Sequence, residues 1–211
     1  MATLRELIAV TSQTLGDPET SVNVQAMHLR RAKLLSSSGR GVYSARMSPS
    51  DATNLVLACA HVGKAKDSPD IVARLRKAPT RSVLRLSGDV AEREEENPRM
   101  PGVMPKLPER ASLGKTLDEL FAEWSSTGTV KNHVTGDLLL VNFELTTTPS
   151  GWSARLNFST PSQNFGCDLI YDQIRAERGD GWGHKEITVR VPDASLNAIA
   201  RCIAAPGGFR D

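Results

Sequence analysis

Ser112 and Lys115 form the pattern in this 211-residue chain that comes closest to a catalytic motif. A serine three residues before a lysine lies on the same helical turn, where the pair can act as nucleophile and base in acyl transfer. The S-D-N and K-T-G motifs that accompany such a pair in penicillin-binding enzymes are missing. We therefore interpret Ser112 as a helix N-cap, and we expect the protein not to be an enzyme.

Two further patterns favour neither phosphate nor metal chemistry. The stretch Gly179-Asp180-Gly181-Trp182-Gly183-His184 is glycine-rich but lacks the G-x-x-x-x-G-K-[ST] spacing, so we expect a hairpin tip with Trp182 exposed. The four histidines have no metal-ligand spacing, and the three cysteines include no C-x-x-C pair. The sequence therefore predicts no metal ion and no cofactor. It also predicts no disulfide framework, as is usual for proteins of a reducing compartment.

The remaining candidate chemistry is the binding of DNA by basic and amide side chains between residues 25 and 46. Lysine and arginine bind phosphates and supply affinity, whereas glutamine, histidine and arginine can hydrogen-bond to base edges in the major groove. We expect base contacts from Gln25, His28 and Arg30, and phosphate contacts from Arg31, Lys33, Arg40 and Arg46.

The charge of the chain is divided unevenly between its two halves. Residues 1–85 contain 13 Lys and Arg against 6 Asp and Glu, whereas residues 86–211 contain 13 against 18. A basic N-terminal half and an acidic C-terminal half favour an anion-binding domain joined to a second module with a different function. The alternative interpretation is that the charges are ordinary solvated surface charges, divided between the two halves by chance.

Helices are expected to position the basic residues. Residues 2–15 have helical periodicity with a Thr3–Glu6 capping box, and Gly16-Asp17-Pro18 then breaks the helix. A second helix is predicted from about residue 19 to Leu35, and the short break between the two is typical of a helical hairpin or a helix-turn-helix. Ser48-Pro49-Ser50-Asp51 is a strong start for an apolar helix over 52–62, and Ser68-Pro69 starts a fourth helix.

The second half of the chain changes to a mixed pattern. Residues 86–107 combine a run of acidic residues with three prolines and predict an extended linker. Beyond it, helical periodicity at 116–124 precedes strands at 138–147, 152–158 and 186–191, and a last helix follows Pro192. Residues 81–90 suit either a short strand or the end of the preceding helix.

The first third of the chain contains the block Gly39-Arg40-Gly41-x-x-x-Ala45-Arg46-Met47-Ser48-Pro49-x-Asp51-Ala52-x-Asn54-Leu55. This block resembles a family of winged-helix or helix-turn-helix proteins encoded by phages and prophages. The resemblance implies DNA binding and a wing around Gly39-Arg40-Gly41, and it implies no catalytic residue.

These observations predict an α+β protein with two domains. A winged-helix-like domain (1–85) binds double-stranded DNA, and a small α+β domain with an antiparallel sheet (108–211) mediates oligomerisation or partner binding. The expected role is a homodimeric, cytoplasmic transcriptional regulator of phage or prophage type, without a secretory signal, a membrane span or an evident small-molecule substrate. The alternatives are a small terminase-like packaging or assembly component and a protein-interaction inhibitor of a host system.

Overall fold

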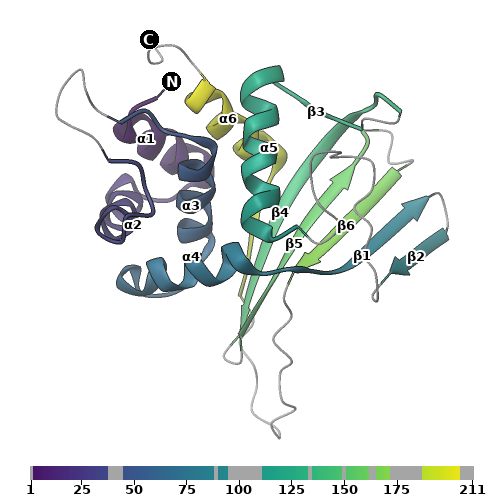
Figure 1. The fold of residues 1–211 in the computed structure, drawn as a ribbon, viewed down its shortest axis with the longest axis horizontal. Helices are drawn as coiled ribbons and strands as arrows, with labels where there is room; N and C mark the ends of the chain where they lie inside the picture. Colours follow the sequence, from purple (N-terminus) through teal and green to yellow (C-terminus); the bar gives the residue numbers. More distant parts are fainter. Residues whose placement is uncertain are drawn as a thin grey trace, which may run out of the picture.

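The computed structural model describes residues 2–37, 45–87, 90–94, 111–132, 135–148, 151–161, 165–171 and 187–204. They form an α+β fold with an antiparallel sheet, which confirms the α+β class and the antiparallel sheet of the prediction (Figure 1). The helices are α1 (Leu4–Leu15), α2 (Glu19–Arg31), α3 (Pro49–Ala60), α4 (Ser68–Lys77), α5 (Leu113–Thr127) and α6 (Asp193–Ala204), with a 3₁₀ helix η2 (Ala65–Asp67). The strands are β1 (Thr80–Ser87), β2 (Val90–Glu94), β3 (Val130–Lys131), β4 (Leu138–Thr148), β5 (Gly151–Ser159), β6 (Phe165–Tyr171) and β7 (Ile187–Val191).

The sheet has the strand order β2-β1-β6-β5-β4-β3, and β7 also pairs with β4. Strand β4 pairs with β5 on one side, while β3 and β7 pair with its other side at its beginning and its end. The register places apolar side chains opposite one another: Phe143 lies between Leu156 and Val191. Because side chains alternate across a strand, this register gathers the apolar residues on one face of the sheet.

Helices α5 and α6 cover the apolar face of the sheet, and α1 to α4 form a further layer beyond them (Figure 1). The buried members of β4 are Leu139, Val141, Phe143 and Leu145, whereas Leu138 and Leu140 are exposed on the other face. Helix α1 packs against α6, and α3 and α4 pack against α5. The helical layer that carries the basic residues is therefore fixed to the sheet through α5 and α6.

The predicted starts of α1 and α3 and the predicted N-cap of α5 are confirmed, because local side-chain hydrogen bonds determine them. Thr3 and Glu6 form the predicted capping box at α1, and Ser48 and Asp51 form one at α3. The Ser112 hydroxyl accepts a hydrogen bond from the backbone N–H of Lys115 at 3.4 Å, which is the N-cap role expected for it.

Helix α2 ends at Arg31, four residues before the predicted end. The backbone N–H of Leu34 bonds to the carbonyl of Leu29 and that of Lys33 to the carbonyl of Arg30, which is the pattern of a Schellman motif. Lys33 occupies the left-handed position with a φ of 58°. The side-chain amide of Asn54 also donates to the Leu34 carbonyl, so the next helix helps to terminate α2.

Strands β2, β3 and β6 occupy segments where the sequence predicted none. The predicted linker starts at residue 86, but residues 86–87 belong to β1 and residues 90–94 form β2, which pairs with β1. Strand β6 occupies a segment that was expected to be irregular, between the second and third predicted strands. Strand β2 was not predicted, because the solvated charges of an acidic run on a sheet-edge strand resemble those of a linker. Residues 95–107 of the predicted linker lie outside the described residues.

The two halves of the chain share one hydrophobic core. Buried residues of α1, α2 and α3 belong to the same cluster as those of α5, α6 and the sheet. Strand β1, which was assigned to the first predicted domain, pairs along its length with β6 of the second. The structure thus differs from the predicted arrangement of two domains joined by a linker, because the apolar faces of α1 and α3 are buried against α6 and α5.

Candidate nucleic-acid interface

Helices α1 and α2 form a hairpin with a three-residue turn, Gly16-Asp17-Pro18. Gly16 adopts a φ of 75°, a conformation that glycine reaches without strain. Its N–H bonds to the Ser12 carbonyl at 3.0 Å, and the Ser12 hydroxyl bonds to the Asp17 carbonyl at 2.6 Å. These bonds fix the direction in which α2 leaves the turn.

One face of α2 is buried and the other is open. Val22, Ala26 and Leu29 anchor the helix in the core. The outward face carries polar and basic side chains together with two apolar ones, Val24 and Met27, that are 40% and 41% exposed. The outward residues recur at the helical spacing and are Asn23, Val24, Met27, Arg30 and Arg31.

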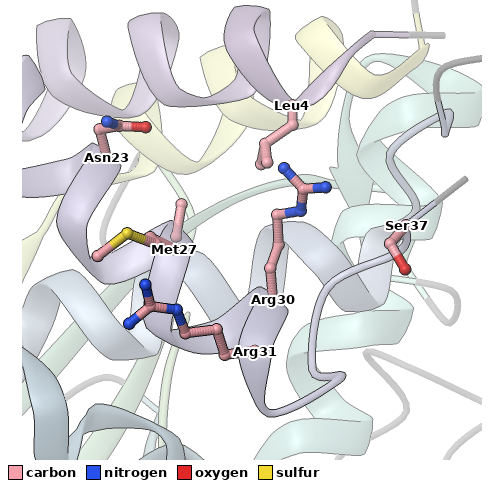
Figure 2. A pocket seen from close by; sticks show the side chains of 7 residues that line it. Leu4, Asn23, Met27, Arg30, Arg31 and Ser37 are labelled. Carbon is pink, nitrogen blue, oxygen red and sulfur yellow. The ribbon is translucent and has the colours of Figure 1, made fainter. Parts of the chain in front are cut away.

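A groove of about 460 Å³ runs along this outward face beside α1 (Figure 2). Arg30 extends from α2 toward Leu4 on α1, while Arg31 runs back along α2 below Met27 (Figure 2). The lining residues are Leu4, Asn23, Ala26, Met27, Arg30, Arg31 and Ser37.

The structure brings most of the predicted DNA-binding residues to the end of α2. Arg30 and Arg31 are exposed in its last turn, and Lys33 is exposed just after it. Arg46 is exposed as well, and its neighbour Met47 donates its backbone N–H to the Ala2 carbonyl at 2.9 Å. That bond holds Arg46 near the start of α1, which lies alongside the end of α2.

The other predicted residues occupy different environments. Gln25 is half-buried, and its side-chain oxygen accepts a hydrogen bond from the Ser68 hydroxyl at the start of α4. His28 is also half-buried on α2. Arg40, with Gly39 and Gly41 of the predicted wing, lies outside the described residues, and those described between α2 and α3 contain no strand.

The acidic side chain of Asp51, in the segment that follows α2, is occupied by local hydrogen bonds. Asp51 accepts the backbone N–H groups of Ser36 at 2.7 Å and Ser48 at 2.8 Å, and both serine hydroxyls also bond to it. One carboxylate thus holds together the two ends of the chain that connects α2 to α3. Within the described part of the chain, Arg30 and Arg31 form no ion pair, so their charge is available to an anion.

Sequence reasoning did not select Leu4, Asn23 or Met27 as members of this surface. The signal for Asn23 and Met27 was present, because they recur at i and i+4 and each directly follows a residue of the buried stripe, Val22 or Ala26. Leu4 could not be found in this way, since its position beside Arg30 depends on how the α1–α2 hairpin closes.

Other candidate chemistry is not supported by the geometry. Burial raises the pKa of the Cys59 thiol to about 12 and that of Cys202 to about 11, so neither forms the thiolate that a nucleophile requires near neutral pH. Burial also lowers the pKa of His61. Among the residues that the structure describes, no cluster of three or more His, Cys, Asp or Glu side chains could hold a metal ion.

None of the helices described is both long enough and apolar enough to span a bilayer. No protein-family model, curated protein or solved structure matches this chain.

Proposed function

We propose that this protein binds double-stranded DNA through the outward face of α2 and acts as a transcriptional regulator of phage or prophage type. The observation that carries the proposal is the pair Arg30 and Arg31. They are exposed on the second helix of a tight helical hairpin, and no described acidic side chain neutralises them. Such a helix suits the major groove, and its cations suit the phosphates on either side.

The contacts divide into those that position the protein and those that read the bases. Arg31, Lys33 and Arg46 bind phosphates, and Arg40 does so from the segment expected to act as a wing. Because Gln25 is half-buried and bonded to Ser68, we assign the base contacts to Asn23 and Arg30 at the open face of α2.

Two copies of the chain are proposed to act together. A single short helix buries little surface on DNA, whereas a dimer places two helices in successive major grooves about 34 Å apart. The acidic C-terminal half is expected to supply the dimer contact, since it would be repelled by DNA phosphates.

The test is a fluorescence anisotropy titration with a labelled duplex of about 30 base pairs at several salt concentrations. We expect the logarithm of the affinity to fall linearly with the logarithm of the salt concentration. The double variant Arg30→Ala/Arg31→Ala should bind more weakly, because it loses the base contact of Arg30 and the phosphate contact of Arg31. Its salt slope should be shallower by about 0.9, since one phosphate contact is lost.

The matched control is Lys115→Ala/Lys131→Ala, which removes the same charge from exposed residues of the other half. Its affinity and salt slope should equal those of the unmodified chain. Absence of binding by the unmodified chain at low salt would overturn the proposed function. An equal loss in both double variants would show that overall charge, rather than α2, determines binding.

A further inference from the structure

The groove beside α2 combines an apolar floor with two cations. Leu4 from α1 and Ala26 and Met27 from α2 contribute the apolar surface, and the guanidinium groups of Arg30 and Arg31 lie at its border (Figure 2). Met27 is 41% exposed, which leaves a thioether side chain in water that a ligand could cover.

The size of the groove suits a small molecule. Its volume of about 460 Å³ lies within the range of small-molecule sites and is too small for a folded partner. Its polar groups, the Asn23 amide and the Ser37 hydroxyl, are few, as in sites where apolar contact supplies affinity and a few polar groups set orientation.

From this combination we propose that the groove binds an amphipathic carboxylate, a molecule with one carboxylate and an aliphatic chain of about 8–12 carbons. The carboxylate pairs with the planar guanidinium of Arg30 or Arg31, which can donate two parallel hydrogen bonds. The chain covers Leu4 and Met27. None of the described residues that line the groove is aromatic, so they offer a nucleobase no ring on which to stack.

Occupancy of the groove has a consequence for DNA. A bound carboxylate neutralises Arg30 and Arg31, the two cations assigned to phosphate and base contacts, so ligand and DNA exclude each other. This exclusion rests on the proposed function, whereas the ligand site rests on the groove alone.

The test of the site is isothermal titration calorimetry of the full chain without DNA, with decanoate as the probe below the concentration at which it forms micelles. We expect saturable binding of one decanoate per chain. Decanol, which lacks the carboxylate, and decyltrimethylammonium, which reverses the charge, should each bind at least ~10-fold more weakly.

Two exposed apolar residues of α2 give a matched pair of variants. Met27→Gln removes apolar surface inside the groove, and Val24→Gln removes it from an equally exposed position that does not line the groove. Met27→Gln and Arg30→Ala/Arg31→Ala should each weaken decanoate binding at least ~10-fold, and Val24→Gln should leave it unchanged. Non-saturable heats, several decanoates per chain, or equal binding by Met27→Gln and the unmodified chain would overturn the site.

A competition titration separates the site from the proposed function. Decanoate should release labelled duplex from the unmodified chain, whereas its release from the Met27→Gln variant should require at least ~10-fold more decanoate. Decanoate binding by a chain that binds no DNA would leave the site standing and overturn the proposed function. DNA binding without decanoate binding would overturn only the site, and binding of both without competition would overturn their exclusion.

Discussion

At the scale of one residue, Lys33 combines an unusual backbone conformation with a positive charge on the proposed interface. It occupies the left-handed position of the Schellman motif that ends α2, with a φ of 58°. A side chain with a Cβ is strained there by about 1–2 kcal/mol, and glycine is the usual occupant. Lysine at this position therefore costs stability while it places a cation beside Arg30 and Arg31.

Replacing Lys33 separates these two effects. We expect Lys33→Gly to be more stable than Lys33→Ala by about 1 kcal/mol, because both remove the charge and only glycine relieves the backbone strain. Urea unfolding measures the difference. Both variants should bind duplex DNA more weakly than the unmodified chain and to the same extent. Equal stabilities would contradict the strain at Lys33, and unequal DNA affinities would show that its backbone geometry matters for binding.

At the scale of elements, β6 is joined to α5 by a buried hydrogen bond. The hydroxyl of Tyr171, the last residue of β6, donates to the hydroxyl of Thr116 on α5 at 2.9 Å. Thr116 in turn donates to the Ser112 carbonyl at 3.1 Å. Burial raises the pKa of Tyr171, so the phenol stays neutral and remains a donor.

We expect Tyr171→Phe to lower the free energy of unfolding by about 1–2 kcal/mol, because it deletes one partner of a buried pair. Thr116→Val should have an effect of the same sign and size. The double variant should lose less than the sum of the two, since it leaves neither hydroxyl without its partner. Denaturant unfolding of the four chains gives the coupling, and additive losses would show that the two side chains act independently.

The elements that could be predicted from the sequence are those determined by neighbouring residues. Thr3 and Ser48 form caps with residues three positions away, so their types and spacing were sufficient. Strand β6 has alternating buried residues, Cys167, Leu169 and Tyr171, but it lies within a segment of weak pattern. The end of α2 depends on Asn54, twenty residues beyond the carbonyl that it binds, and such a contact leaves no local signal.

At the scale of the whole molecule, Arg76 ties the two halves together. It donates to Asn54 on α3 at 3.0 Å and forms a two-bond pair with Asp118 on α5, at 3.2 and 2.6 Å. Its side chain also lies against Gly114, where an added Cβ would come within 2.8 Å of the Arg76 Cβ. The charge balance does change near residue 86, from basic to acidic. The hydrophobic core does not divide there, because surface charge and buried contacts are separate properties.

A shared core predicts one cooperative unfolding transition for the full chain. All three tryptophans lie in the second half, so their fluorescence reports that half, whereas far-UV circular dichroism also reports α1 to α4. We expect both signals to give the same midpoint in urea. A fragment ending at residue 85 should lack a cooperative transition, because the faces of α1 and α3 that pack on α6 and α5 would be exposed to water and β1 would lose its partner β6. Separate midpoints, or cooperative unfolding of the fragment, would instead support an independently folding N-terminal domain. The DNA affinity of that domain could then be measured without the rest of the chain.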